Sequence, residues 1–193
     1  MTDCMNAFLE ISMLHIARAA VIVAMLAAPA GAQNFEAANV DNLRLVLSGY
    51  HEVPGPDYWQ KLDANAARAS LLRLSSDKNE LIHIRTRAVA ALANFVDPQV
   101  ERSLIDMFNS QERGYLRAAA LNTYSAIRGR QAVPALERSL SDKDEIVKIS
   151  AIRCLGRVGG EQAERILQGA LQVESDPVAR GAMGRSLQRA SRR

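Results

Sequence analysis

The chain has few of the residues from which metal and redox sites are built: two cysteines and three histidines among 193 residues. Cys154 is the only cysteine after Cys4, so we expect no disulfide within the body of the chain. No histidine has ligand residues at a metal-binding spacing, and "HEVPG" lacks the second histidine of a zinc protease motif. The sequence therefore predicts no metal and no cofactor.

The sequence also lacks the short motifs of common enzymes. It contains no G-x-S-x-G nucleophile motif, no glycine loop that cradles phosphate and no cysteine–histidine pair. These absences favour a protein that is not an enzyme.

Aromatic residues are scarce, at 5% of the chain, although 48% of the residues are hydrophobic. Much of that hydrophobic content is alanine, whereas sheets favour β-branched and aromatic side chains. The composition therefore predicts an all-α protein with closely packed helices.

The N-terminal segment contains no apolar run long enough to span a membrane. Its apolar stretch, residues 19–28, is ten residues long, whereas a bilayer span needs about 20. The stretch follows Arg18 and leads to Ala30-Gly31-Ala32, which fits a signal-peptidase site. We expect residues 1–32 to be a cleavable signal peptide, so that the protein is exported to the periplasm without a transmembrane anchor. Met13 is an alternative start to Met1, because acidic residues are unusual in the segment between them.

A repeat of about 32 residues organises the rest of the chain. A basic residue marks four units, with separations of 32, 31 and 32: Arg85, Arg117, Lys148 and Arg180. Three positions later comes a small or apolar residue: Ala88, Ala120, Ala151 and Met183. Nineteen and twenty-three positions after the basic residue, three units have a second apolar pair: Leu104 and Phe108, Leu136 and Leu140, Leu167 and Leu171. Two apolar stripes at helical period predict one helical hairpin per unit, which buries its stripes by stacking on its neighbours.

Turn residues separate the two helices of each unit, in "FVDPQ", "IRGRQ" and "RVGGEQ". Asp97 is positioned to cap a helix that starts at Pro98. Pro134 falls in the first turn of its helix, where backbone N–H groups have no partner within the helix. Each proline therefore marks a helix start.

These units resemble HEAT repeats, of the short type also seen in phycobilisome-lyase-like proteins. The resemblance is carried by "RTRAVAALANFVDPQVERSLIDMF", "LRAAALNTYSAIRGRQAVPALERSL" and "VKISAIRCLGRVGGEQAERILQGAL", and it covers roughly residues 80–190. It implies a right-handed α-α superhelix of about four helix pairs plus a C-terminal half-repeat. It also implies that the second helices line a concave side.

The two ends depart from the repeat. The last unit stops after "VARGAMGRSLQRASRR", a first helix without its partner. Upstream, "NAARASLLRL" fits a second helix, and the short "DYWQKL" is expected as its first helix. We expect residues 33–56 to form an N-terminal cap helix, at about 41–49, and a loop. The repeat array is then expected over residues 57–193.

Partner binding is predicted on the second helices. Their polar side chains point away from the apolar stripes: Arg102, Asp106, Glu137, Arg138, Arg165 and Gln168. Such a surface suits recognition of a protein or peptide, although every soluble helix has a polar face.

The loop "YHEVPGPDYW" offers a second candidate site, formed by Tyr50, His51, Glu52 and Trp59. Aromatic residues with a polar tip are favoured at recognition surfaces. The alternative is that Trp59 closes the open end of the first repeat.

Charged residues allow two further interpretations. The basic residue that marks each unit follows an acid four or five positions earlier: Glu80, Glu112, Asp144 and Asp176. We expect ion pairs that hold the units in register rather than a ladder that binds anions. Residues 146–193 carry nine basic residues against four acidic ones. Four of the nine share the outward face of first helices: Arg153, Arg157, Arg185 and Arg189.

The sequence thus predicts an exported, non-catalytic scaffold that binds a protein or peptide. One alternative is a lyase-like enzyme or enzyme accessory with Tyr50, His51 and Glu52 near a pocket. Another is an electrostatic binder of an anionic envelope polymer through the C-terminal arginines. Nucleic acid is not expected as a partner, because no aromatic residues lie among these arginines to stack on bases.

Overall fold

The computed structural model describes residues 38–49 and 54–192. All belong to one compact unit, Phe35–Arg193. The expected signal peptide lies outside the described residues, as do Tyr50, His51 and Glu52 of the loop. No helix in the described part is both long and apolar enough to cross a membrane.

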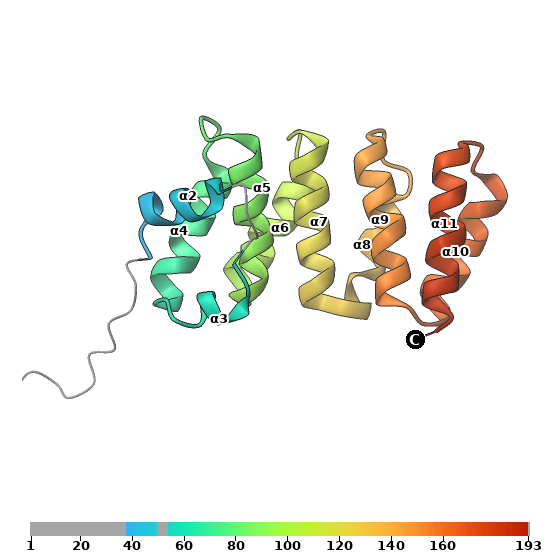
Figure 1. The fold of residues 1–193 in the computed structure, drawn as a ribbon. Helices are drawn as coiled ribbons and strands as arrows, with labels where there is room; N and C mark the ends of the chain where they lie inside the picture. Colours follow the sequence, from blue (N-terminus) through green and yellow to red (C-terminus); the bar gives the residue numbers. More distant parts are fainter. Residues whose placement is uncertain (1–37, 50–53, 193) are drawn as a thin grey trace, which may run out of the picture. The chain divides into compact units, whose positions relative to one another are not determined.

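Helices make up almost all of the regular structure in these residues (Figure 1). In chain order they are α2 (Val40–Ser48), α3 (Pro56–Trp59), α4 (Ala64–Ser76), α5 (Ile82–Ala91), α6 (Pro98–Phe108), α7 (Gly114–Arg128), α8 (Val133–Ser139), α9 (Glu145–Val158), α10 (Glu161–Val173) and α11 (Pro177–Ala190). Short 3-10 turns follow α5 and α7, at Leu92–Asn94 and Gly129–Ala132. The all-α class and the HEAT-like solenoid predicted from the sequence are confirmed.

The helices form two rows. The first helices α5, α7, α9 and α11 pack side by side and stand in front in Figure 1, with α6, α8 and α10 behind them. Each first helix also packs against the second helix that precedes it in the chain, as α6 does with α7 and α10 with α11. Every unit therefore buries its apolar surface against the next unit.

The turn residues act as the sequence predicts. The Asp97 carboxylate accepts hydrogen bonds from the backbone N–H groups of Gln99 and Val100, and Pro98 opens α6. Pro134 lies in the first turn of α8. Gly129 ends α7 with a φ of 53°, a conformation that side chains with a Cβ rarely adopt. The breaks in the apolar pattern are therefore genuine helix ends.

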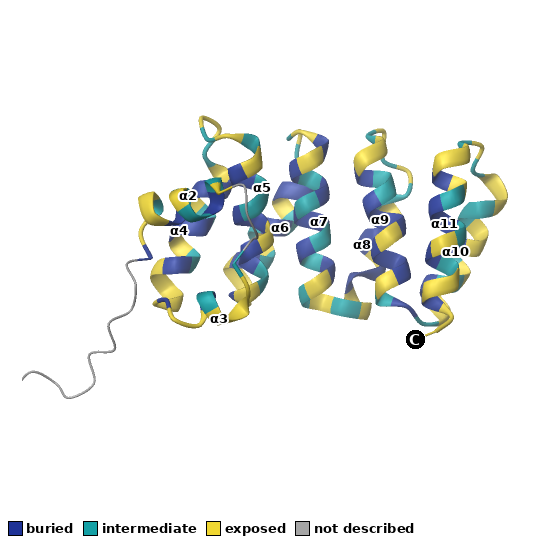
Figure 2. Cartoon of the chain, in the orientation of Figure 1, coloured by how far each residue is buried: buried dark blue, intermediate teal, exposed yellow. Residues whose placement is uncertain are grey.

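The core confirms the repeat register. Leu104, Leu136 and Leu167, which occupy the same position in three units, are all fully buried. Buried residues lie on the sides where helices face one another, and exposed residues concentrate at the loops (Figure 2). Small residues let the first helices approach closely: a Cβ on Gly156 of α9 would lie 2.8 Å from the Cα of Ser186 of α11.

One expectation about the N-terminal end is wrong. The sequence predicts "DYWQKL" as the first helix before α4, but α2 occupies that position and packs against α4 and α5. Arg87 of α5 also donates hydrogen bonds to the carbonyl oxygens of Leu47 and Gly49 at the end of α2. The helix in "DYWQKL", α3, has only four residues. The pattern failed here because the number of residues between α2 and α4 lengthens the unit beyond 32 residues.

Candidate partner-binding site

Ion pairs between units occupy one edge of the array. Arg85 makes a two-pronged contact with Glu112, at 2.8 and 3.3 Å, and its Nε donates to the carbonyl of Ser75 at the end of α4. Arg117 pairs with Asp142, and its Nε bonds the carbonyl of Phe108. Each arginine therefore joins the end of the preceding second helix to an acid of the next unit.

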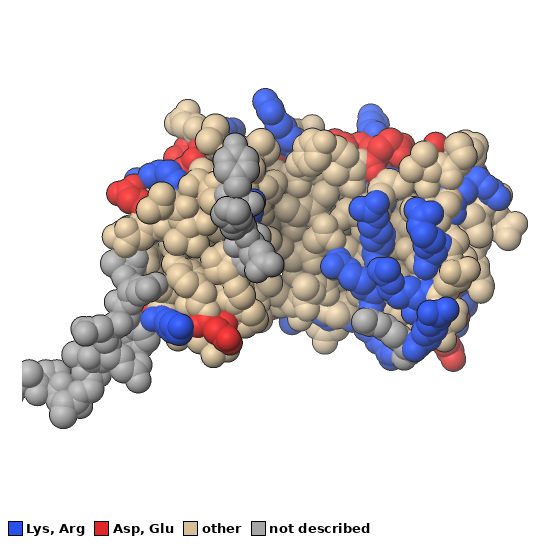
Figure 3. Space-filling model, in the orientation of Figure 1, with Lys and Arg blue, Asp and Glu red and all other residues tan. Residues whose placement is uncertain are grey.

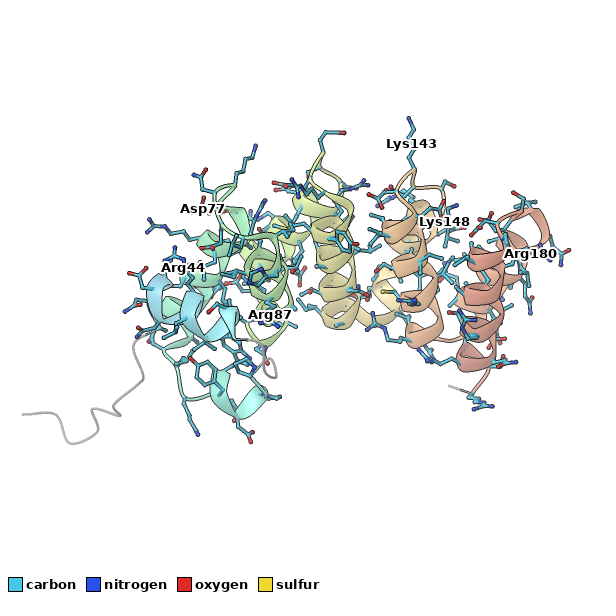
Figure 4. The ribbon with its side chains drawn as sticks, turned by 45° about the horizontal axis from the view of Figure 1, so that its top comes forward. Arg44, Asp77, Arg87, Lys143, Lys148 and Arg180 are labelled. Carbon is cyan, nitrogen blue, oxygen red and sulfur yellow. The ribbon has the colours of Figure 1, made fainter. Side chains whose placement is uncertain are left out.

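We call this series of ion pairs between units the ladder, and it continues toward both ends of the array. Arg44 of α2 pairs with Glu80 at 2.6 Å, and Lys148 of α9 lies 3.5 Å from Glu174. Arg180 of α11 donates hydrogen bonds to the carbonyl oxygens of Leu171 and Glu174, and it forms no ion pair with a described carboxylate. Figure 4 shows Lys148 and Arg180 near the starts of their helices. The ladder thus ends where the repeats end.

The acids of the ladder differ in part from the predicted ones. Glu80 and Glu112 are members, but Asp144 and Asp176 instead cap α9 and α11. The ladder acid precedes each of these caps by two residues, at Asp142 and Glu174. Asp144 and Asp176 each accept a hydrogen bond from a backbone N–H of their own helix, and neither forms an ion pair with another described residue.

These contacts keep the acids charged. The hydrogen bond from Arg85 lowers the pKa of Glu112, and the hydrogen bond from Arg44 lowers that of Glu80. The pKa of Glu174 is lowered first by the backbone N–H of Asp176 and then by the charge of Lys148. The ladder cations are therefore occupied within the protein, and the ladder is structural.

Trp59, one of the four residues of the candidate loop site, is buried in the core. Trp59 is only 3% exposed, and its Nε1 donates to the carbonyl of Pro54 at 3.0 Å. Its ring meets Phe95 edge to face, with centroids 6.0 Å apart, and packs in the same way on Tyr58. This burial corrects the placement of Trp59 in a recognition site and matches its alternative role in closing the end of the array.

The six predicted residues of the second helices are all exposed. They do not line one continuous groove. Arg102 and Asp106 border a hollow of about 490 Å³, whereas Glu137 and Arg165 border another of about 640 Å³. Arg138 and Gln168 border neither of these hollows.

A larger hollow lies on the other row, the face of the first helices. It measures about 690 Å³ and runs across α5, α7 and α9. Half of its lining is apolar: Ile82, Tyr115, Ala118, Ala119, Ile146 and Ile149. The other half is polar: His83, Thr86, Asn122, Glu145, Ser150 and Arg153. The sequence analysis did not identify this site.

Two exposed apolar residues that line this hollow, Tyr115 and Ile146, belong to a row that continues to Val178 of α11. Tyr115 of α7 and Val178 of α11 are 64% and 67% exposed, and Ile146 of α9 is also exposed. All three stand two positions before the basic residue of their units, as does His83 of α5. These positions recur in the sequence at the repeat spacing, but the apolar pattern that predicts the helices consists of the buried residues alone.

Arginines cover the C-terminal part of the same face. Arg153 and Arg185 occupy equivalent positions on α9 and α11, and Arg157 and Arg189 follow one turn later. All four are exposed. Figure 3 shows that Lys and Arg side chains gather over α9 and α11. Arg153, Arg185 and Arg189 make no ion pair with any carboxylate of the described residues. We call these four residues the arginine cluster.

Cys154 lies beneath this cluster and is fully buried. Its Sγ is 2.9 Å from Oδ1 of Asn122 and 2.9 Å from a guanidinium nitrogen of Arg157. Burial keeps the thiol from solvent, as expected for a small core residue between α7 and α9. Within the described residues no group of three or more potential ligands could hold a metal ion.

Comparisons with known proteins agree with this architecture. Residues 104–188 match the model of a family described as HEAT repeats. A crystal structure of an engineered protein is similar over 79% of each chain, with a TM-score of 0.50 and 18% sequence identity, which supports the fold alone. No curated protein matches the chain in sequence.

The stacked helix pairs define an α-solenoid, a class of protein that is built by adding similar units along one direction. Within that class, the units over residues 104–188 match HEAT repeats, and the chain is a helical repeat scaffold.

Proposed function

We propose that this protein is a non-catalytic scaffold that binds a protein or peptide partner on the face of its first helices. The observation that carries the proposal is the 690 Å³ hollow across α5, α7 and α9, with the exposed Tyr115 and Ile146 at its border. Exposed apolar side chains beside a hollow are typical of interaction sites.

This site lies on the first helices, whereas the sequence predicts partner binding on the second helices. The hollows near Arg102 and Glu137 are smaller, and exposed mixed charge alone is what a solvated helix face also shows. The second-helix face remains the competing surface in the tests below.

The enzyme alternative finds no specific support among the described residues. It depends on Tyr50, His51 and Glu52, which lie outside them. We also propose export, on the basis of the signal-like segment before Gln33.

Photocrosslinking at single positions tests the binding face. A photoreactive amino acid replaces Tyr115 on the first-helix face or, as the matched control, Gln168 on the second-helix face, both of which are exposed. After irradiation in the native host, we expect a protein adduct from position 115 and none from position 168. Adducts from position 168 alone would transfer the site to the second helices, and no adducts at either position would contradict partner binding on these faces.

A further inference from the structure

We propose that the partner segment is an acidic peptide with apolar anchor residues, whose anchors enter the hollow while its carboxylates meet the arginine cluster. This inference rests on the proposed function and adds the chemistry of the partner. It follows from the position of Arg153, which lines the hollow and also belongs to the cluster.

The two parts of the surface are continuous along the repeat. Asn122 of α7, which lines the hollow, occupies the same position in its unit as Arg153 and Arg185 do in the next two. A bound peptide that extends from the hollow toward α11 therefore passes the side-chain amide of Asn122 and then the guanidinium groups of Arg153 and Arg185. Guanidinium groups bind carboxylates in a fixed two-pronged geometry, which makes arginine well suited to acidic partners.

The cluster differs from the arginines of the ladder. Arg85 and Arg117 are matched by acids, whereas Arg153, Arg185 and Arg189 make no ion pair with a described carboxylate. Arg185 and Arg189 are four residues apart on α11, where like charges destabilise the helix. An anionic partner that binds these two residues relieves this repulsion.

The apolar hollow favours a peptide over other anions. A polymer that carries only charge leaves the apolar lining exposed to water. Nucleic acid binding uses aromatic residues interleaved with basic ones, and none lies among Arg153, Arg157, Arg185 and Arg189. A membrane surface is met by many apolar side chains that protrude together with basic ones. Here only Tyr115 and Ile146 of the apolar lining are exposed, and the other apolar lining residues are buried or half-buried. A peptide that combines apolar and acidic side chains matches both parts.

The probe is a displayed library of random 16-residue peptides, selected on the purified protein. We expect the selected peptides to place Asp or Glu beside Leu, Ile or Phe.

Fluorescence anisotropy then gives the Kd of one selected peptide for each variant. The double substitution Arg153→Ala and Arg185→Ala should weaken binding about tenfold, and added salt should weaken it further. Tyr115→Ala should weaken binding independently, by at least about threefold, because an exposed anchor contact is lost without loss of the fold.

The matched control removes the same two charges from the other face. Arg138→Ala with Arg165→Ala, both exposed on second helices, should leave the Kd within about twofold. Thermal unfolding checks that each variant remains folded.

The outcomes separate this inference from the proposed function. Selected peptides without acidic residues that still lose binding with Tyr115→Ala would overturn the acidic partner and leave the scaffold proposal standing. Peptides that depend on Arg138 and Arg165, or the absence of any selected peptide, would contradict both. Poly-glutamate, DNA or vesicles of anionic lipid that bind as tightly as the selected peptide, with no effect of Tyr115→Ala, would replace the peptide by a simple polyanion.

Discussion

Arg85 and Arg153 carry the same charge but have different surroundings. Arg85 is buried, and it bonds Ser75 and Glu112 from two other elements. Arg153 is exposed on the rim of the hollow and makes no ion pair with a described acid. The first residue therefore contributes to stability, and the second is available for binding.

Glu112→Gln tests the ladder at the residue scale. Arg85 lowers the pKa of Glu112 in the folded state, so the stabilisation is present above the unfolded value of about 4.5 and is lost as the pH falls through the lower, folded value. At pH 7 we expect the variant to lose about 1–2 kcal/mol, because Arg85 stays buried without its charged partner. The difference from the parent protein should shrink below pH 4.5 in urea unfolding curves. A difference that does not change between pH 7 and pH 3 would contradict this role of Glu112.

The sequence alone does not determine which acid of each unit pairs with the neighbouring arginine. Asp142 and Asp144 are both close enough in sequence to pair with Arg117, and only backbone geometry assigns Asp144 to the helix cap. Charge spacing predicts that ion pairs exist between units, but it cannot choose between two acids that are two residues apart.

Leu136→Ala tests the repeat register at the scale of helices. Leu136 is fully buried in α8, in the position held by Leu104 and Leu167. We expect a loss of about 2–5 kcal/mol in the free energy of unfolding, as is usual when a buried leucine is truncated. A loss below about 1 kcal/mol, typical of surface positions, would mean that the register is wrong.

Gly156→Ala tests the close approach of α9 and α11. The added Cβ would lie 2.8 Å from backbone and side-chain atoms of Ser186, so α11 has to shift. We expect a loss of about 1–3 kcal/mol in denaturant unfolding.

Gly169→Ala in α10 is the matched control, because a Cβ there has no neighbour within 4 Å. It should gain about 0.5–1 kcal/mol from the higher helix propensity of alanine. Equal effects of the two substitutions would show that α9 and α11 are not held at this distance.

Hydrophobic periodicity predicted the paired helices from about residue 80 onward, since each stripe repeats at a fixed offset. It failed before α4, because Arg44 and Arg85 are equivalent in their ion pairs but are separated in sequence by more than one repeat length. Hydrophobic periodicity also could not predict the hollow, because the hollow depends on the distances between α5, α7 and α9. The exposed residue at the position of Tyr115 was visible in sequence, but its meaning depends on that spacing.

Export belongs to the scale of the whole molecule. Because Ala30-Gly31-Ala32 fits a signal-peptidase site, N-terminal sequencing of the protein from its native host should begin at Gln33. A protein that begins at Met1 or Met13 would contradict export by this route.

The central claim is that partners bind the face of the first helices. Charge reversal at Arg185 and Arg189 alters that face, and charge reversal at Glu137 and Arg138 alters the second-helix face. All four residues are exposed, so each change should alter the free energy of unfolding by no more than about 0.5 kcal/mol per residue.

The measurement is the affinity of each double variant for the partner identified by crosslinking at position 115. We predict that the Arg185→Glu and Arg189→Glu protein loses the partner, whereas the Glu137→Lys and Arg138→Glu protein keeps it. Retention of the partner by the first variant and its loss by the second would contradict the first-helix site.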